Sequence, residues 1–92
     1  MKETPLEVGE IEELVKKLIN DALELDEVFV VFDGSQCRIN AVSDKFDDLS
    51  RVKRQQAVLK PLADIIKDGT IHAVTVKTFN KAQWQRDKLF NS

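Results

Sequence analysis

The sequence is poor in the residues that build self-contained metal and redox sites. Its 92 residues include one cysteine, Cys37, one histidine, His72, and no tyrosine. A single cysteine excludes an internal disulfide, so a reducing cytoplasmic location is expected. Structural zinc sites and [2Fe–2S] clusters usually take four Cys or His ligands, and this chain offers two. Any such metal site would have to be shared with a second molecule.

Long apolar runs are also missing. Residues 1–5 lack the hydrophobic stretch of a signal peptide, and no segment approaches the roughly 18 apolar residues of a membrane span. A formal net charge of −2 and a pI of about 5.4 argue against a bulk nucleic-acid binder, although a local basic patch stays open. We expect a soluble intracellular protein with one domain, residues 1–92, whose core covers about residues 6–89.

Motifs of the common enzyme sites are missing too. The sequence contains no phosphate-binding loop, nucleophile elbow or metalloprotease helix. No serine, acid or second histidine lies at a recognisable spacing from His72 to form an acid–base pair with it. The sequence therefore predicts a protein that is not an enzyme.

The apolar pattern predicts an α-β-β-α(α)-β-α order of elements. A first helix, with a cap offered by Thr4, carries apolar residues at helical spacing over 11–23. Strands follow at 28–32 and from Cys37 onward, joined by the turn residues 33–35. The later elements are a second helix capped by Ser50 and broken at Pro61, a strand at 71–78, and a last helix capped by Asn80.

This order would place the only thiol and the only imidazole at one edge of a sheet. The helix between strands two and three suits a parallel, right-handed crossover, and parallel neighbours begin at the same end, about 4.8 Å apart. Cys37 starts the second strand and His72 the third, so together they could form a two-ligand edge. The alternatives stay open: His72 can be a packed residue with one hydrogen bond, and Cys37 a small buried hydrophobe on the face of Ile39.

Positive charges gather at the start of the second helix. Arg51, Lys53 and Arg54 occupy its first turn, where the helix dipole disfavours cations by about 0.3–1 kcal/mol each. A solvated charged face is the common explanation, and the aspartates within 44–48 can neutralise part of it. The placement also indicates a retained anionic contact: a partner's carboxylates, glutathione or a phosphate backbone.

Four segments together resemble one family. In chain order they are VSDKF at 42–46, SRVKRQQ at 50–56, IHAVTVKT at 71–78 and Trp84 of the last helix. This set is similar to the BolA family and, with the DGS turn at 33–35, looks most like its IbaG (YrbA) branch. The resemblance implies an α+β fold of αββααβα order: a three-stranded mixed sheet with helices packed on one face, similar to a class II KH domain.

The resemblance also implies a binding role. Proteins like these bind a monothiol glutaredoxin, and the pair holds a bridging [2Fe–2S] cluster with ligands from the glutaredoxin cysteine, glutathione and the BolA-like chain. The resemblance implies that the isolated chain holds no cluster. The family's third-strand ligand falls on His72. Where relatives carry a histidine or cysteine near the hairpin, this chain has Gln36 and then Cys37, and a one-residue shift turns a side chain to the opposite face. Cys37 is thus a candidate second ligand, and Gln36 a candidate partner contact.

Two functions follow. We expect an adaptor for iron–sulfur cluster assembly or trafficking, linked to acid or oxidative stress, that is a monomer or weak dimer when isolated. The alternative is a DNA-binding transcription regulator that uses a KH-like basic surface at Arg51, Lys53 and Arg54. The GXXG loop of RNA-binding KH domains is absent from this sequence.

Overall fold

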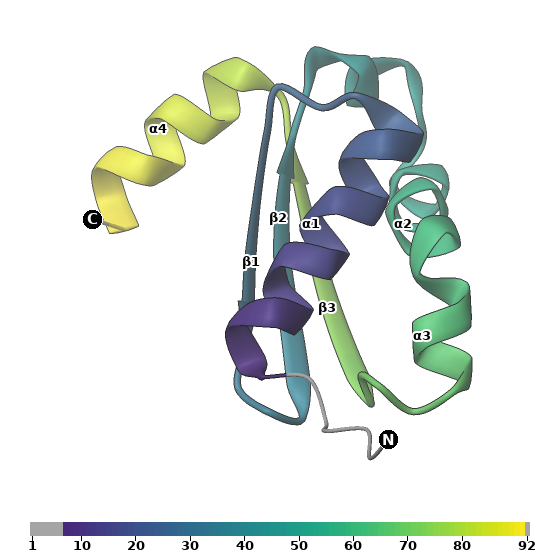
Figure 1. Cartoon of the computed structure of the whole chain (residues 1–92). Helices are drawn as coiled ribbons and strands as arrows, with labels where there is room; N and C mark the ends of the chain where they lie inside the picture. Colours follow the sequence, from purple (N-terminus) through teal and green to yellow (C-terminus); the bar gives the residue numbers. More distant parts are fainter. Residues whose placement is uncertain (1–6, 92) are drawn as a thin grey trace, which may run out of the picture.

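The computed structural model describes residues 7–91 (Figure 1). Its elements, with short 3-10 helices written η, are α1 (Val8–Leu23), β1 (Glu27–Phe32), β2 (Gln36–Val42), η1 (Asp44–Asp48), α2 (Arg51–Leu59), η2 (Lys60–Leu62), α3 (Ala63–Lys67), β3 (Ala73–Phe79) and α4 (Lys81–Asn91). This succession confirms the predicted αββααβα order. Within the described residues, no helix is both long enough and apolar enough to span a bilayer.

Local chemistry sets the helix boundaries. Ser50 Oγ accepts the backbone N–H of Lys53 at 3.3 Å, which confirms the predicted cap of α2. Pro61 lies in η2, where α2 gives way to α3, because proline has no N–H for a continuous helix. The cap predicted at Thr4 lies outside the described residues.

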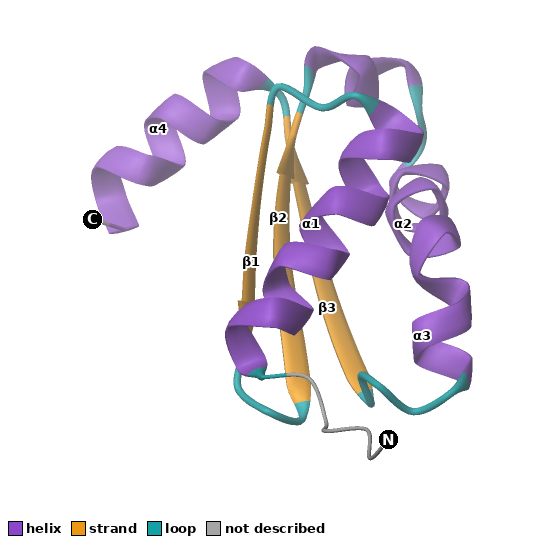
Figure 2. Cartoon of the chain, in the orientation of Figure 1, coloured by secondary structure: helices purple, strands orange, loops and turns teal. Residues whose placement is uncertain are grey.

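The sheet has the order β1-β2-β3 (Figure 2). Strands β1 and β2 are antiparallel and form a hairpin, whereas β2 and β3 are parallel and are linked through the helices. In the parallel pair, Gln36 lies opposite Ala73 and Val42 opposite Phe79. The predicted mixed sheet, with strands two and three adjacent, is therefore confirmed.

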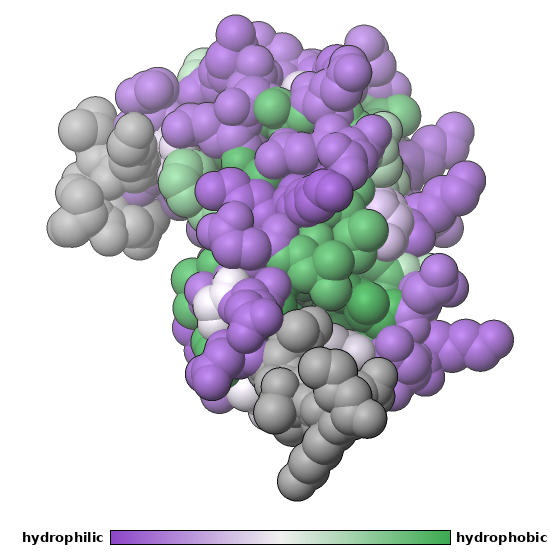
Figure 3. Space-filling model, viewed as in Figure 1, coloured by the Kyte–Doolittle hydropathy of each residue, from purple (hydrophilic) through white to green (hydrophobic). Residues whose placement is uncertain are grey.

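One face of the sheet forms the hydrophobic core with α1, α2 and η2. Every second residue of the strands points to this face, and α1 contributes residues four apart. The buried side chains are Ile11, Val15, Ile19, Val28, Phe32, Cys37, Ile39, Ala41, Phe46, Val58, Leu62, Ile71 and Val76. On the surface seen in Figure 3, apolar residues also come to view between α1 and α3, within a largely hydrophilic face.

Helix α4 differs from the other helices because it contacts the opposite face of the sheet. Trp84 of α4 stacks on Phe29, with ring centroids 5.0 Å apart, and lies 5.2 Å from the ring of Phe79 at a tilt of 57°. Phe29 is in register with Asn40 and Lys77, which point away from the core. Packing on one face therefore holds for α1, α2 and α3, while α4 covers one end of the outer face.

The third strand begins later than the sequence pattern predicts. It starts at Ala73 and ends at Phe79, rather than covering 71–78. Ile71 is fully buried in the core, and its N–H donates to the carbonyl of Ile65 in α3 at 3.3 Å. The apolar run therefore includes an anchor between helix and strand, and His72 lies just before the strand.

Candidate functional site

The starts of β2 and β3 bring His72 next to the hairpin turn. The backbone N–H of His72 donates to the carbonyl of Ser35 at 3.3 Å, and that of Ala73 donates to the same oxygen at 3.4 Å. The imidazole is exposed, and Gln36, half-buried, lies opposite Ala73. Figure 2 shows both strand starts at one end of the sheet. The predicted edge is therefore formed around His72.

The hairpin turn is closed by an aspartate. Asp33 Oδ1 accepts the N–H groups of Gln36 at 2.7 Å and Ser35 at 3.0 Å. Gly34 has φ +101°, a conformation that residues with a side chain rarely adopt. The hydrogen bond from Gln36, followed by that from Ser35, holds the pKa of Asp33 below its ordinary value, because both stabilise the charged carboxylate.

A second aspartate closes the turn that precedes His72. Asp68 Oδ1 accepts the hydroxyl of Thr70 at 2.6 Å and the N–H of Thr70 at 2.8 Å. The hydrogen bond from the Thr70 hydroxyl, followed by that from its N–H, lowers the pKa of Asp68 below its ordinary value. Between them Gly69 has φ +85°, and a Cβ built there would lie 3.9 Å from Cε1 of His72. His72 thus follows a turn that is fixed by its own side-chain chemistry.

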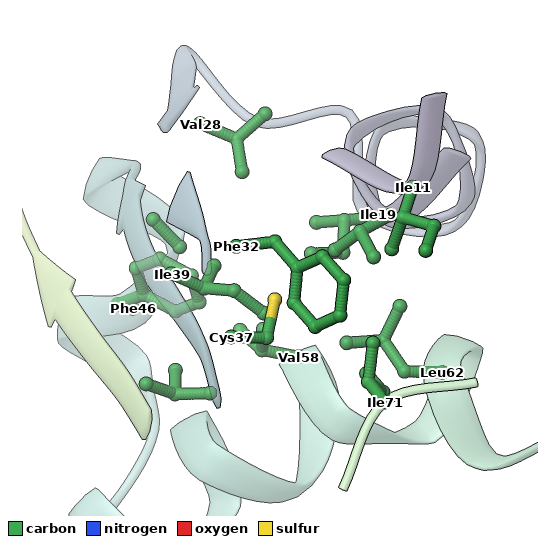
Figure 4. Packing of buried hydrophobic residues seen from close by; sticks show 13 residues of the cluster. Ile11, Ile19, Val28, Phe32, Cys37, Ile39, Phe46, Val58, Leu62 and Ile71 are labelled. Carbon is green, nitrogen blue, oxygen red and sulfur yellow. The ribbon is translucent and has the colours of Figure 1, made fainter. Parts of the chain in front are cut away.

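Cys37 lies on the inner side of the sheet. Its exposed fraction is 0%, and Figure 4 shows its sulfur among the side chains of the core, close to Phe32. Burial raises the pKa of the thiol, and the negative charge of Glu12 raises it further. Both effects disfavour the thiolate that binds metals. This position agrees with the alternative that Cys37 is a small buried hydrophobic residue. Its role as a ligand stays a prediction, and its burial disfavours that role.

No cluster of ligands accompanies His72. Within residues 7–91, no group of three or more His, Cys, Asp or Glu side chains could hold a metal ion. The imidazole is nevertheless accessible, and its backbone is held by the hairpin. The role of His72 as a ligand therefore stays a prediction, and the structure shows the imidazole accessible at this edge.

The predicted basic residues lie at the opposite end of β3. Arg51 and Lys53 are exposed, and Arg54 donates from Nε to the carbonyl of Leu49 at 2.9 Å. A groove of about 440 Å³ is lined by Arg51, Arg54 and Lys77, with Phe79 at the end of β3. Val76, the first residue of β3 that lines this groove, lies four residues along the chain from His72, or about 13 Å. The structure therefore brings Gln36 to His72 but keeps the basic residues apart from both.

The aspartates upstream of α2 were expected to neutralise part of the basic first turn of that helix. In the structure, two of them contact the start of α4. Asp44 Oδ1 accepts the N–H of Lys81 at 3.0 Å, and its other oxygen lies 3.9 Å from Lys81 Nζ. Asp47 Oδ1 accepts from the side-chain amide of Asn80 at 3.1 Å. Sequence reasoning missed these contacts, because nothing in the local pattern links residues more than thirty positions apart.

Comparison with known proteins identifies the family. A model described as BolA-like protein matches residues 32–83. The acid stress protein IbaG of Escherichia coli K12 is 44% identical over 77 residues, which cover 84% of this chain and 92% of the relative. An uncharacterised protein of Haemophilus influenzae is 36% identical over 77 residues, 84% of this chain and 91% of the relative. The chain belongs to the BolA family.

Solved structures show the same BolA-like fold. BolA1 from Mus musculus matches with a TM-score of 0.75 at 18% identity, over 96% of this chain and 79% of that one. The BolA domain of SufE1 from Arabidopsis thaliana gives 0.71 at 23% identity, over 83% and 98%. Yeast Fra2 gives 0.64 at 22% identity, over 95% and 92%. At these identities the likeness concerns the fold, and it agrees with the predicted α+β class.

Proposed function

We propose that this BolA-family protein is a non-enzymatic adaptor of iron–sulfur metabolism. It binds a monothiol glutaredoxin and gives His72 as one ligand to a [2Fe–2S] cluster that the two proteins share with glutathione. The observation that carries the proposal is the exposed imidazole, which stands alone at the sheet edge on a fixed backbone. An accessible donor without companions suits a shared centre.

The chemistry of imidazole fits this role. A [2Fe–2S] cluster transfers electrons, and replacing thiolate by neutral imidazole raises its reduction potential. An imidazole ligates only when its ring nitrogen is unprotonated, so acid weakens the bond. This dependence offers a physical link to acid stress, the condition in the name of the relative IbaG. In the proposed complex the remaining ligands come from the partner and glutathione, because Cys37 faces the core.

Cluster reconstitution with a monothiol glutaredoxin and glutathione tests the proposal. His72→Ala should change the visible absorption and circular dichroism of the mixed complex, because a ligand is lost. Cys37→Ala is the matched control: provided that far-ultraviolet circular dichroism shows a folded protein, its cluster spectrum should equal that of the wild type. A His72→Ala complex with the wild-type spectrum would exclude ligation by His72.

A second candidate function, nucleic-acid binding, is favoured by the groove at the other end of β3. Its three positive side chains, Arg51, Arg54 and Lys77, can face a phosphate backbone. Arg51→Ala should weaken DNA binding and reduce the slope of log affinity against log salt by about 0.9, the value for one phosphate contact. Lys60→Ala, an equal charge change at the far end of α2, should have little effect. No binding at low salt would remove this candidate.

The two functions can be separated because their residues lie apart. If both operate, His72→Ala should leave DNA binding unchanged, and Arg51→Ala should leave the cluster spectrum unchanged. The groove begins at Val76, four residues and about 13 Å of extended strand from His72, and this distance separates the two sites. A substitution that affects both measurements would indicate one shared interface.

A further inference from the structure

The backbone of His72 is held from two sides by turns that each depend on an aspartate. On one side, the turn at 68–70 leads from α3 to His72. On the other side, the hairpin turn at 33–36 supplies the carbonyl of Ser35 that accepts the His72 N–H. Neither carboxylate bonds to the imidazole, so any effect on His72 passes through the main chain.

The Asp68 turn fixes the approach to His72. Asp68 binds both the hydroxyl and the N–H of Thr70 through one oxygen, at 2.6 and 2.8 Å. The next residue, Ile71, is fully buried and bonds back to α3. The chain is therefore tied at consecutive residues before it reaches His72, which leaves little freedom in the direction of its Cα–Cβ bond.

The Asp33 turn fixes the acceptor that His72 uses. Asp33 Oδ1 receives the N–H groups of Ser35 and Gln36, so the peptide plane of Ser35 is held in one orientation. The Ser35 carbonyl then takes the N–H groups of both His72 and Ala73. Removing the Asp33 carboxylate would free the Ser35 peptide, and the main chain of His72 would lose a fixed partner.

The imidazole lies near the glycine of the Asp68 turn. Cε1 of His72 would lie 3.9 Å from a Cβ at position 69, an ordinary van der Waals distance. The ring is thus next to the space that a side chain at position 69 would occupy, while it stays exposed to solvent. Its orientation depends on the shape of that turn, which Asp68 and Thr70 close.

We infer that Asp33 and Asp68 are positioning residues that present the His72 imidazole in one direction toward a partner-borne centre. The inference rests on the proposed function of His72 as a ligand. Groups hydrogen-bonded directly to a metal ligand typically change metal affinity about 10–100-fold when they are removed, and Asp33 and Asp68 act less directly, through the main chain. A ligand that is held before binding also loses less freedom when the complex forms.

The first test needs no cluster. His72 is the only histidine, so the two ring C–H signals, from Cδ2 and Cε1, belong to it alone in the full-length protein. Asp33→Ala and Asp68→Ala should speed hydrogen exchange at the His72 amide and increase motion of the ring, as measured by NMR relaxation. Asp33→Asn and Asp68→Asn keep an accepting oxygen and should restore slow exchange. Asp64→Ala removes an exposed carboxylate from α3 and should change neither quantity.

The second test uses the complex reconstituted with a monothiol glutaredoxin and glutathione. Asp33→Ala and Asp68→Ala should each weaken complex formation by up to about 10-fold, the lower end of the effect of a directly bonded partner, with rescue by the asparagine variants. Should an alanine variant not fold, Thr70→Val against Thr70→Ser examines the same turn through its hydroxyl. If His72→Ala alters the cluster spectrum while these variants change neither His72 motion nor affinity, the positioning role is overturned. If His72→Ala itself has no effect, the proposed function fails instead.

Discussion

Trp84 allows a quantitative test of how α4 is attached to the sheet. Its ring contacts Phe29 and Phe79, and it is half-buried between α4 and the outer face. Its indole Nε1 is buried and has no hydrogen-bond partner among the described residues. The same side chain therefore contributes favourable ring contacts and an unfavourable buried donor, and two substitutions separate these effects.

The magnitudes predict a clear loss of stability for one substitution and almost no change for the other. Trp84→Ala removes two aromatic pairs, each worth about 0.5–1.5 kcal/mol beyond the buried area, together with that area. The free energy of unfolding should fall by about 2–4 kcal/mol. Trp84→Phe keeps a ring for both contacts and removes the unpartnered N–H, which costs about 1–3 kcal/mol when buried. This gain offsets the smaller ring, so the variant should lie within about 1 kcal/mol of the wild type.

Urea unfolding followed by far-ultraviolet circular dichroism measures both free energies. Fluorescence serves only the wild type, because Trp84 is the only tryptophan. In the wild type, coincident fluorescence and dichroism curves are expected if α4 unfolds with the rest of the domain. A Trp84→Phe variant as unstable as Trp84→Ala would refute the reasoning, because it would mean that the indole N–H makes a stabilising bond.

Three further predictions concern the core and the turns. Cys37 should react with a thiol reagent only on unfolding. Because its pKa is raised in the folded protein, its contribution to stability is present below the ordinary pKa of 9.0 and is lost at higher pH. The free energy of unfolding, measured between pH 7 and 10, should therefore fall toward the upper end of this range. Asp33 and Asp68 have lowered pKa values, so their contribution is present above the ordinary value of 3.8 and is lost as the pH falls further; acid titrations of the asparagine variants should show a weaker dependence. Leu62→Ala should lower the free energy of unfolding by about 2–5 kcal/mol in the same urea assay, because Leu62 is fully buried.

Features that depend on local chemistry could be predicted from the sequence. Ser50 and Asn80 cap their helices as expected, since a short side-chain oxygen reaches an N–H within the next turn. Pro61 breaks the second helix because its ring excludes a regular hydrogen bond. The position of His72 beside the hairpin turn followed from strand order, since parallel neighbours start at the same end, whereas the exposure of its ring did not. Each of these inferences needs only a few residues.

Features that depend on distant contacts could not be predicted. The run from Ile71 to Val76 looks like one strand, yet Ile71 packs into the core ahead of the first strand residue, Ala73. Apolar periodicity does not distinguish a strand residue from an anchor next to it. The attachment of α4 to the outer face rests on Trp84 meeting Phe29, far away in the sequence, and no local signal indicates which face a terminal helix will choose.

The number of ligands that this chain can offer is decided by one step along β2. Side chains of a strand alternate between faces, so Gln36 and Cys37 must point in opposite directions. Gln36 lies opposite Ala73 at the edge with His72, which sends the thiol into the core. A thiol at position 36 would have joined the imidazole at the surface, whereas at 37 it acts as a small hydrophobic side chain. Of the Cys and His side chains within residues 7–91, only that of His72 then remains accessible, so the proposed cluster, which takes four ligands, would need the others from a partner and glutathione.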